Sequence, residues 1–563
     1  MNKIISLLML IMLFPQVGNT QTDTIKASAD SRILWVTDKP VPKFIIQSTR
    51  DFRERLLGDH YRPAFHFCEP EGAGSPGDPN GAFYYNGQYH LMYLYNREGR
   101  GFSWGHISSS DLLHWRHHPD AIGPGNGDEG CFSGGAFVDK NGKAVLSYWQ
   151  LWGARGIGLA ENNDKSFDKW TKSSSNPVIK STDWGITVAK DKNNRDVIYG
   201  SADPSNIWFK DGQYYMLTGN LLVLRKYGSH GTGLPANDPH GPGLPADSVS
   251  FQGDHLYLFA SKDLKQWEYL HEFYKSDRRW TDKTEDNMCP SFLPLPSGPD
   301  GGTMSDKYLL LFISHNKGCQ YYIGSYRNDM FYPDNHGRMT WNDNAYFAPE
   351  ALVDGKGRQI MWSWVFDDRP DSIKNYYGWT GSFGLPRSLW LGEDGTLRMR
   401  PVKELENLRQ NEKVKRNFTV KAGSDSGLDD FGSELLELEI TMLPGNSKKC
   451  GVMVCCSKDG REKTILYYDA LKKKLMCDAT GSGIGFGRKI VEGGPFELKP
   501  DEPLVLHVFV DRSIVEVFAN DRQAVTRNIY PELRGTGVKL FSEGGDVKVL
   551  SVKAWEMTPA NPY

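Results

Sequence analysis

The chain has 563 residues, with 66 Lys and Arg against 69 Asp and Glu, and its formal net charge is −3. This balance excludes a nucleic-acid binder of the simple electrostatic kind, because such proteins need a basic surface to release counterions. Apolar residues make up 39% of the chain and charged residues 24%, which excludes an intrinsically disordered protein. The 12% of aromatic residues and the 59 glycines indicate β architecture with many turns, and a site whose rings stack on sugars.

The first twenty residues resemble a secretory signal peptide. Lys3 precedes an apolar run over residues 4–14, and small polar residues follow as far as Thr20. The run is too short to cross a bilayer, and no other stretch reaches the length of about 18 apolar residues that a span needs. We therefore predict a signal peptide over 1–20, an N-terminal extension over 21–55, no membrane span, and export to the periplasm or the exterior.

A turn-and-strand pattern recurs in the part of the chain that follows. Each copy has a turn rich in Asn, Asp, Lys and Gly and then an apolar strand. The copies lie at residues 86–93, 141–148, 211–217, 306–312 and 354–364. A second pattern, an Asp-capped turn closed by a Trp, occurs at 110–115 and 262–267, with a looser copy at 164–170. Five such units, none able to bury its own face, predict a five-bladed β-propeller; a β-sandwich with unrelated hairpins is the alternative.

The pattern changes after residue 402. Residues 403–416 are charged and compatible with a helix, which is typical of a linker. Beyond them, apolar and polar residues alternate as they do in the strands of a β-sandwich. We therefore predict an all-β fold, with a five-bladed β-propeller over 56–402 that carries the site, followed by a C-terminal β-sandwich over 417–563.

Three of the predicted blades begin with an acidic residue near a proline. Asp78 and Asp203 each stand directly before a proline, and Glu285 stands shortly before Pro290. A single Asp-Pro turn is commonly a surface feature in which the Asp caps the turn. Equivalent positions in a radial fold converge on its axis, so we predict that Asp78, Asp203 and Glu285 meet at one end of the channel. Converging carboxylates suit glycoside hydrolysis.

We predict neither a metal nor a cofactor. The histidines near the first repeat, among them His106, His114, His117 and His118, show no spacing typical of a metalloenzyme. The eight cysteines show none either. We expect most of the cysteines to be small buried apolar residues, with a disulfide within the 450–477 cluster as the alternative.

An ordered series of short motifs runs from about residue 62 to residue 556. The motifs are Arg62-Pro63 with His66-Phe67, Asp78-Pro79-Asn80-Gly81, Trp104-Gly105-His106, Phe132-Ser133-Gly134, Asp203-Pro204, Cys289-Pro290, Gly378-Trp379, Leu385-Pro386-Arg387 and the run from Val510 to Phe518. The series resembles glycoside hydrolase family 32, which holds the invertases, inulinases and levanases. The resemblance implies a five-bladed propeller with a β-sandwich, a retaining mechanism and β-fructofuranoside substrates.

Three positions depart from the pattern of that family. Met288 stands where the family has the Glu of its Glu-Cys-Pro motif, and it has no proton to give. Ala202 replaces an Arg and Leu94 replaces a Gln, at positions that bind fructosyl hydroxyls in the family. A site that loses such polar groups recognises its sugar less well, so we predict low activity on sucrose compared with a larger substrate.

The resemblance also implies roles for individual residues. Asp78 is expected to be the nucleophile, and Asp203 is expected to stabilise the transition state through the sugar hydroxyls. The residues expected to bind the substrate are Asn80, Trp104, Phe132, Ser133, Trp379 and Glu350. For each aromatic ring among them, the alternative location is the core of a blade.

The acid is the role for which the sequence offers several residues. Because Met288 cannot donate a proton, the nearest alternatives are Asp282, Glu285 and Asp286, and Glu350 lies further along in the following blade. We predict that Glu285 is the acid and base, since its longer side chain can span the displaced loop. A partly apolar pocket beside a second carboxylate would keep it protonated.

These observations predict an exported retaining glycoside hydrolase that cleaves β-fructofuranosidic bonds in fructan-type oligo- or polysaccharides. Its predicted partner is a carbohydrate substrate, and neither a nucleic acid nor a membrane is expected. One alternative is an enzyme acting on another furanoside of the arabinan type. The other is a catalytically silent carbohydrate-binding protein on the same scaffold. The sequence carries no signal for an oligomeric state.

Overall fold

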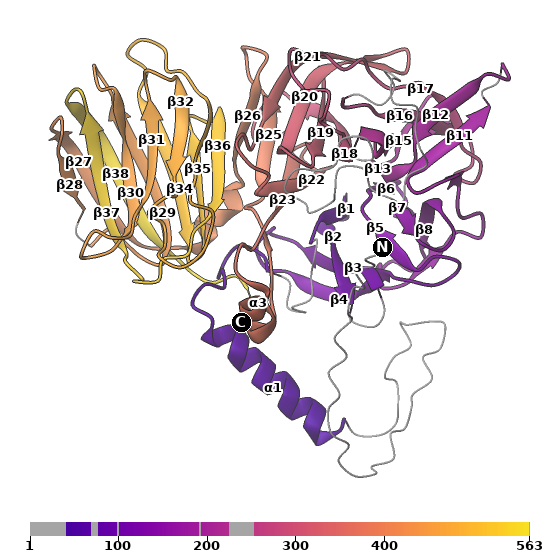
Figure 1. Cartoon of the computed structure of the whole chain (residues 1–563), viewed down its shortest axis with the longest axis horizontal. Helices are drawn as coiled ribbons and strands as arrows, with labels where there is room; N and C mark the ends of the chain where they lie inside the picture. Colours follow the sequence, from indigo (N-terminus) through magenta and orange to yellow (C-terminus); the bar gives the residue numbers. More distant parts are fainter. Residues whose placement is uncertain are drawn as a thin grey trace, which may run out of the picture. The chain divides into compact units, whose positions relative to one another are not determined.

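Five antiparallel sheets follow one another between Pro79 and Pro401, and each takes its strands from one continuous stretch of chain (Figure 1). The first is β1 (Pro79–Tyr85), β2 (Gln88–Arg97), β3 (Gly101–Ser109) and β4 (Arg116–Ile122). The second is β5 (Gly130–Phe132), β6 (Ala136–Val138), β7 (Ala144–Leu151), β8 (Gly156–Asn162), β9 (Trp170–Lys172) and β10 (Ile179–Lys180). The third is β13 (Ala202–Pro204), β14 (Trp208–Lys210), β15 (Gln213–Gly219), β16 (Tyr257–Ser261) and β17 (Glu268–Glu272). The fourth is β18 (Met288–Pro296), β19 (Met304–Ser314), β20 (Gly318–Arg327) and β21 (Met330–Arg338), and the fifth is β22 (Tyr346–Val353), β23 (Gln359–Val365), β24 (Ser382–Phe383), β25 (Arg387–Leu391) and β26 (Leu397–Pro401).

These sheets are the blades of a five-bladed β-propeller, which confirms the predicted fold class. The innermost strands contact one another around the axis: β1 touches β6 and β22, and β18 touches β13 and β22. A separate pair, β11 (Ile186–Lys190) and β12 (Asp196–Gly200), stands between the second and third blades. The structure describes residues 41–68, 77–97, 101–190, 193–223, 253–428 and 430–561. The predicted signal peptide and most of the predicted extension lie outside these ranges.

The repeated turns adopt the conformations that their residues favour. Asn86 and Gly87 both have positive φ, at 47° and 84°, as do Asp211 and Gly212. Two consecutive left-handed residues make the tight hairpin turn that Asn-Gly and Asp-Gly favour. In the second pattern, Asp111 Oδ1 accepts hydrogen bonds from the backbone N–H groups two and three residues later, at 3.0 and 2.9 Å. The repeats therefore mark the hairpins and turns of successive blades.

Two six-stranded sheets form the C-terminal β-sandwich (Figure 1). One is ordered β27 (Arg409–Val420), β38 (Val547–Met557), β29 (Leu435–Leu443), β34 (Leu504–Asp511), β35 (Ile514–Ala519) and β36 (Gln523–Asn528). The other is ordered β28 (Asp425–Gly427), β37 (Gly537–Glu543), β30 (Lys449–Cys456), β31 (Thr464–Asp469), β32 (Lys474–Asp478) and β33 (Val491–Pro495). Their facing apolar side chains, such as Leu438, Val452 and Val508, form one buried cluster. All eight cysteines are free thiols, and every one except Cys289 is buried.

The segment predicted as a linker is structured along its whole length. A 3₁₀ helix runs over Lys403–Leu408, and β27 then begins at Arg409, earlier than the predicted start of the sandwich at 417. Strand β27 is an edge strand paired only with β38. Most of its side chains are charged or polar and exposed, so it lacks the alternation that marks a half-buried strand. The backbone hydrogen bonds with β38 make this segment a strand, and such bonds leave no apolar alternation in the sequence.

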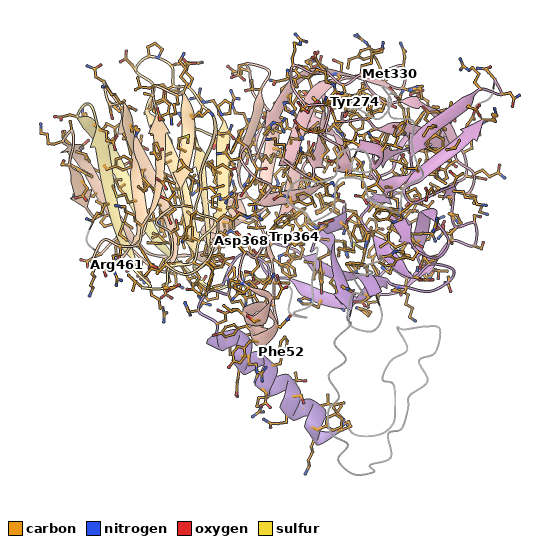
Figure 2. All side chains as sticks on the ribbon, in the orientation of Figure 1. Phe52, Tyr274, Met330, Trp364, Asp368 and Arg461 are labelled. Atoms are coloured by element: carbon orange, nitrogen blue, oxygen red, sulfur yellow. The ribbon has the colours of Figure 1, made fainter. Side chains whose placement is uncertain are left out.

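Two helices lie outside the sheets in the described part of the chain. They are α1 (Lys43–Gly58), within the predicted extension, and α3 (Asp371–Tyr377), which follows β23. They contact each other, and Phe52 on α1 lies close to Gly378 at the end of α3 (Figures 1 and 2). Gly378 has φ +77°, and a Cβ there would meet the Phe52 ring at 2.3 Å. None of the helices in these ranges is long and apolar enough to cross a membrane.

The ring of blades closes through side chains. The first blade contains only strands from residues 79–122, so no strand from the other end of the described chain completes it. Instead Glu350 on β22 accepts a hydrogen bond from the Ala82 backbone N–H on β1 at 2.8 Å. Next to it Arg358 donates to both Asp354, at 2.8 Å, and the Tyr89 hydroxyl, at 2.8 Å. The last and first blades are thereby joined by buried polar contacts.

Two sandwich carboxylates support the same seam. Asp511 accepts hydrogen bonds from the backbone N–H groups of residues 64–66, which lead into the first blade, at 2.7 to 2.8 Å. Glu516 accepts from the Leu385 backbone N–H at 2.6 Å and from Arg387 at 2.7 Å, both at the last blade. His66 lies between them, with Nδ1 2.9 Å from Asp511 and Nε2 3.1 Å from Glu516. Burial acts to lower the pKa of His66, but these two hydrogen bonds raise it to about 9.

Replacing Asp511 should test how much this seam contributes to stability. Asp511→Ala leaves three buried N–H groups and His66 without their acceptor, so we expect a loss of about 3–5 kcal/mol in the free energy of unfolding. The matched control is Asp546→Ala, since Asp546 is 45% exposed and pairs with Lys421 at the surface. Its loss should be much smaller, because water and salt screen the contact. Equal losses for both variants in denaturant titrations followed by fluorescence would contradict a special role for the seam.

Candidate active site

Asp78 and Asp203 meet at the axis of the propeller, where both contact one thiol. The Sγ of Cys289 lies 3.8 Å from Asp78 Oδ2 and 3.4 Å from Asp203 Oδ2. The two carboxylate oxygens can therefore be no farther apart than these two distances combined, which lies within the range over which glycosidase carboxyl groups cooperate, about 5–9.5 Å. The side chains come from the first, third and fourth blades. The expected convergence thus holds for Asp78 and Asp203, and it includes a cysteine.

An irregularity repeated in the innermost strands directs these side chains. The pairing register shifts at Asp203 in β13 and at Cys289 in β18, and similar shifts occur in β1 and β22. Asp203 and Cys289 have positive φ, at 33° and 49°. A bulge of this kind changes the direction in which a strand residue points. The bulges of the third and fourth blades therefore turn Asp203 and Cys289 toward the axis, whereas Asp78 stands directly before β1 and outside the bulge of that strand.

Burial raises the proton affinity of both carboxyl groups. Asp78 and Asp203 are each 3% exposed. Burial raises the pKa of Asp78 to about 6, although hydrogen bonds from Ser133 and Cys289 act in the opposite direction. Burial and then the charge of Asp78 raise the pKa of Asp203 to about 7. Near neutral pH the pair therefore holds about one negative charge, with Asp78 ionised first.

Each carboxylate has one buried oxygen that accepts no hydrogen bond from the described residues. Ser133 Oγ donates to Asp78 Oδ2 at 2.6 Å, whereas Asp78 Oδ1 and Asp203 Oδ1 have no hydrogen-bond partner among the described residues. Asn80 supports the turn: its amide donates to the Asp78 carbonyl at 2.9 Å and accepts from the Gly134 N–H at 3.1 Å. Buried polar atoms are almost always paired, so the two free oxygens mark the place where a ligand would bind.

Glu285 turns away from this pair. It makes a two-point ion pair with Arg338, at 2.7 and 2.8 Å, and accepts from Gln320 at 3.1 Å. Arg338 ends β21, the outermost strand of its blade, so Glu285 points outward from the axis. Burial acts to raise the pKa of Glu285, but Arg338 lowers it below its ordinary value. The lowered pKa favours the ionised carboxylate, whereas the predicted role as an acid needs the protonated form.

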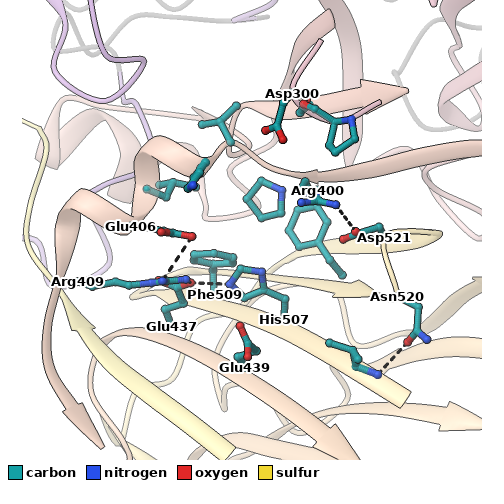
Figure 3. Close-up of a pocket in the computed structure, with 18 of the residues that line it drawn as sticks. Asp300, Arg400, Glu406, Arg409, Glu437, Glu439, His507, Phe509, Asn520 and Asp521 are labelled. Atoms are coloured by element: carbon teal, nitrogen blue, oxygen red, sulfur yellow. Dashed lines mark hydrogen bonds and ion pairs between the residues drawn. The ribbon is translucent and has the colours of Figure 1, made fainter. Parts of the chain in front are cut away.

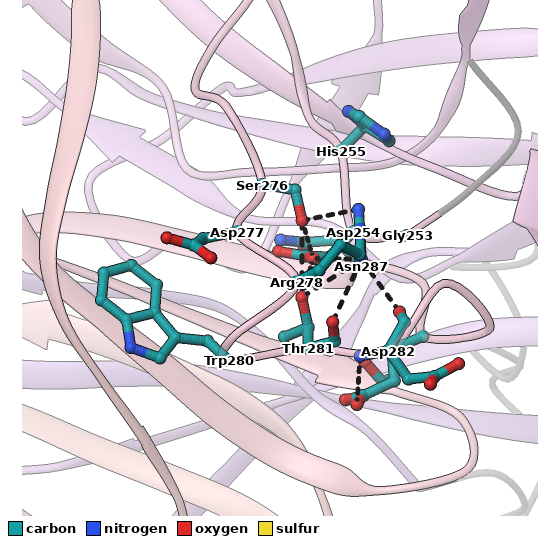
Figure 4. A network of polar contacts seen from close by, with 12 residues as sticks. Gly253, Asp254, His255, Ser276, Asp277, Arg278, Trp280, Thr281, Asp282 and Asn287 are labelled. Atoms are coloured by element: carbon teal, nitrogen blue, oxygen red, sulfur yellow. Dashed lines mark hydrogen bonds and ion pairs between the residues drawn. The ribbon is translucent and has the colours of Figure 1, made fainter. Parts of the chain in front are cut away.

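A buried network fixes the loop that carries Glu285. Asp254 is fully buried and accepts hydrogen bonds from Tyr274 at 2.7 Å and from Ser276 and Thr281 (Figure 4). Asn287 donates to the Tyr274 hydroxyl at 2.9 Å, which joins the end of the loop to the same group. The loop over 276–287 is therefore held at both ends, and the outward direction of Glu285 is part of that arrangement.

His315 is a functional candidate that sequence reasoning missed. It follows β19, and its Nδ1 lies 2.7 Å from Asp286. Burial acts to lower the pKa of His315, but Asp286, Asp203 and Asp78 together raise it above its ordinary value. It is therefore an ionisable side chain that interacts electrostatically with both site carboxylates. No motif in the sequence marks it, because the link to Asp78 and Asp203 runs across blades.

Trp364 covers the chain segment before Asp78. A Cβ at Gly77 would lie 2.8 Å from Trp364 Nε1, and one at Gly381 would lie 2.3 Å from it. Both glycines also have positive φ, at 80° and 70°. Trp364, labelled in Figure 2, has a buried Nε1 without a partner in the described part of the chain. Gly381, two residues after Trp379, is thus needed for the close approach of the Trp364 ring.

The predicted aromatic residues divide between the site and the core. Trp104 is fully buried in a blade core, where its Nε1 donates to the Phe132 carbonyl at 3.1 Å. Trp379 lies near the helices, donates to Asp59 at 2.7 Å and is covered by the Arg369 guanidinium at 4.1 Å. Phe132 is half-buried and directly precedes Ser133. Of these three aromatic residues, only Phe132 is next to a residue that contacts the carboxylate pair, namely Ser133. Glu350, also predicted to bind substrate, instead joins the last blade to the first through Ala82.

Phe132 belongs to a row of rings that reaches the surface. The row, called here the aromatic row, consists of Trp184, Trp149, Phe132, Phe102 and Trp152. Successive ring centroids lie 5.5, 5.7, 5.0 and 6.3 Å apart. Trp152 at its end is 54% exposed. Aromatic faces pack well against sugar rings, so the row offers a path from Ser133 outward.

A cavity lies away from these carboxylates, between the last blade and the sandwich. It has a volume of about 400 Å³ and a charged lining (Figure 3). Arg400 pairs there with Asp521 at 2.8 Å and Arg409 with Glu437 at 2.6 Å. The four charges neutralise one another in pairs, and none of the predicted site residues lines the cavity. Its size therefore does not mark it as the catalytic site.

Comparisons with known proteins agree with the division into a propeller and a sandwich. The family model for the glycosyl hydrolases family 32 N-terminal domain matches residues 67–228 and 246–401, and the model for the C-terminal part of that family matches residues 404–556. Levanase from Bacillus subtilis is 29% identical over 544 residues, which cover 89% of this chain and 72% of levanase. β-Fructofuranosidase, insoluble isoenzyme CWINV1, from Arabidopsis thaliana is 26% identical, covering 92% of this chain and 94% of that protein. The crystal structure of fructan 1-exohydrolase IIa from Cichorium intybus shares the fold with a TM-score of 0.73 at 22% identity, covering 89% of this chain and 98% of that one.

The buried pair should cost the folded protein stability at high pH. Because the folded state holds the Asp203 proton more tightly than the unfolded chain, stability falls as pH rises from about 4 through 7. Asp203→Asn removes this effect, so at pH 8 we expect it to be more stable than the parent by about 1–4 kcal/mol, and the difference should shrink at pH 5. Melting temperatures at both pH values measure it. The control is Asp211→Asn, whose side chain is 80% exposed; a pH-dependent gain for this control too would refute the explanation.

Proposed function

The chain belongs to glycosyl hydrolases family 32, as its motifs predict, and from that premise we propose that it is a retaining hydrolase of β-fructofuranosidic bonds in fructan-type oligo- and polysaccharides. As a glycoside hydrolase it acts on O-glycosyl bonds. One observation carries the proposal: Asp78 and Asp203 meet at Cys289, each with one unpaired oxygen. The likeness to a levanase supports the polymer as substrate.

Asp78 is the proposed nucleophile. Its Oδ2 is held by Ser133, and its unpaired Oδ1 attacks the anomeric carbon of the fructosyl unit. The bond to the leaving oxygen breaks as that oxygen takes a proton, and a fructosyl ester of Asp78 remains. Water, deprotonated by the group that gave the proton, then hydrolyses the ester. Asp203 Oδ1 accepts from the sugar hydroxyls while positive charge develops on the ring.

We propose His315, in place of Glu285, as the proton donor. Glu285 is committed to Arg338 and points outward, and Met288 offers no proton. His315 is held at Nδ1 by Asp286, so its Nε2 carries the transferable proton. The raised pKa favours the charged form of His315, which an acid needs, and Asp78 ionises with a pKa of about 6. The acid thus moves from the Glu-Cys-Pro position to the neighbouring strand.

The shape of the site favours a long substrate. Ala202 and Leu94 are both fully buried and apolar, so neither gives a hydrogen bond to a fructosyl hydroxyl. The aromatic row compensates by offering ring faces to further sugar units beyond the one that reacts. With the predicted signal peptide, this supports export and action on fructans outside the cytoplasm.

The proposed substrate class predicts an ordering of activities. Purified enzyme should release fructose from levan or inulin with a higher kcat/KM than from sucrose, and should release nothing from arabinan. Asp78→Ala should abolish release from all of them. Activity on arabinan and on none of the fructosides would show that the substrate is an arabinan-type furanoside and not a fructan. Tight binding of fructan without any hydrolysis would instead establish the silent carbohydrate-binding protein.

A variant of the aromatic row tests why polymeric fructan should be a better substrate than sucrose. Trp152→Ala should lower kcat/KM on polymeric fructan by about threefold to tenfold, the usual value of one aromatic contact, and leave the value for sucrose unchanged. Phe209 on β14 is comparably exposed at 53% but lies outside the row. Phe209→Ala should therefore match the parent enzyme on both substrates, and an equal loss for both variants would disprove the role of the row.

The identity of the acid predicts a dependence on the leaving group. His315→Gln should lose most activity on fructans, whose sugar alkoxide needs a proton, but retain much more on an aryl β-fructofuranoside, whose phenolate leaves unaided. Asp78→Ala should lose both activities. Glu285→Gln weakens the contact with Arg338 and should reduce the two activities alike. A selective loss for Glu285→Gln, with none for His315→Gln, would return the role to Glu285.

A further inference from the structure

Three histidines from adjacent strands of the first blade come together beneath its surface. His90 lies on β2, His106 on β3 and His118 on β4, and His106 and His118 stand directly opposite each other. One possible ligand nitrogen from each lies within 4.8 Å of the other two. In the described residues no other cluster of His, Cys, Asp and Glu has this compactness. The family mechanism uses none of them.

Two of the three nitrogens have a spacing close to that of metal ligands. His90 Nδ1 and His106 Nε2 are 3.0 Å apart. Two imidazole nitrogens bound to one tetrahedral zinc, each at about 2.0–2.1 Å, lie about 3.3 Å apart. A shift of a few tenths of an ångström would therefore allow both to bind one ion. Ser108 Oγ lies 2.7 Å from His118 Nε2 and places an oxygen beside the third ligand.

A second layer of contacts orients the rings. His118 Nδ1 lies 2.6 Å from Asp168, which belongs to the turn before β9. A histidine that binds a metal commonly donates its other ring N–H to a carboxylate in this way. The bond leaves Nε2 of His118 facing the cluster. Asp168 is 30% exposed, so this side of the cluster is also the path by which an ion can enter.

The surroundings hold the rings in place beneath the surface of the blade. His90 and His106 are 4% and 1% exposed. His106 Nδ1 is buried and has no hydrogen-bond partner in the part of the chain that is described. Phe83 stacks on His90 with ring centroids 4.6 Å apart, which limits the freedom of that ring.

We propose that His90 Nδ1, His106 Nε2 and His118 Nε2 bind a divalent transition metal ion, with zinc the best match and an oxygen from Ser108 or water as the fourth ligand. Imidazole ligands suit zinc, cobalt, nickel and copper, whereas magnesium and calcium prefer oxygen. The ion ties β2, β3 and β4 to the turn that carries Asp168. It is a structural site in the blade that begins with Asp78. The absence of a metalloenzyme spacing in the sequence does not conflict with it, because the ligands meet across strands.

Equilibrium dialysis of the full chain, without an affinity tag and after removal of metals with EDTA, tests the proposal. We expect one Zn²⁺ per chain, a rise in melting temperature on adding Zn²⁺, and visible d–d bands of a four-coordinate site on adding Co²⁺. His118→Ala should lose the stoichiometric binding and the Co²⁺ bands. Asp168→Asn keeps all three ligands and should weaken binding about 10–100-fold.

His114→Ala is the matched control. His114 lies in the same blade, but its side chain is 60% exposed and paired with Asp111. It should bind Zn²⁺ as the parent does. Circular dichroism shows whether each variant is folded, and if His118→Ala is not, Asp168→Asn still decides the outcome. Binding of less than one ion per chain, or binding unchanged in Asp168→Asn, would overturn the proposal. No substrate is involved, so the result is independent of the proposed hydrolysis.

Discussion

The ring of blades depends on buried carboxylates at one seam. A propeller whose blades each use consecutive strands has no backbone pairing between its last and first blades, so side chains must join them. Here Glu350 and Asp354 from the last blade bind the first, while Asp511 and Glu516 hold both from the sandwich. These carboxylates accept from backbone N–H groups that would otherwise be buried without partners. The sandwich is thus part of what closes the propeller.

The seam also positions the site. Asp78 precedes β1, the strand that Glu350 fixes through Ala82, and Trp364 on the last blade packs over Gly77. Asp203 and Cys289 reach the same point from other blades, because bulges turn them toward the axis. Two carboxyl groups held this close in a buried place are unfavourable for folding. A rigid ring, closed on both sides, is the physical condition under which such a pair persists.

Function in this protein follows from which groups remain unsatisfied. Glu285, Asp254 and Asp511 are buried carboxylates with several partners each, and they hold loops and domains together. Asp78 and Asp203 each retain an oxygen without a partner. Sequence motifs do not distinguish these two kinds of carboxylate, since both kinds stand at or near the ends of strands. The number of hydrogen bonds that each carboxylate accepts in the folded chain distinguishes the two kinds.

The sequence by itself determined the blades and the pair Asp78 and Asp203. Turn residues and alternating strands are local properties, legible within about ten residues, and the family motifs add an order to them. The sequence also identified Phe132 and Ser133, which are adjacent to one of these motifs. Strand β27 was not predicted from the sequence, because an exposed edge strand paired through its backbone has no apolar alternation.

Only the tertiary structure decided the directions of side chains and the contacts between strands. It turned Glu285 outward to Arg338, brought His315 within reach of the site, and buried Trp104 and Trp379. It also gathered His90, His106 and His118, which lie on three strands with no regular spacing. Each of these outcomes depends on strand register and on bulges at left-handed residues. Those are set by packing across the whole ring, and no short stretch of sequence encodes them.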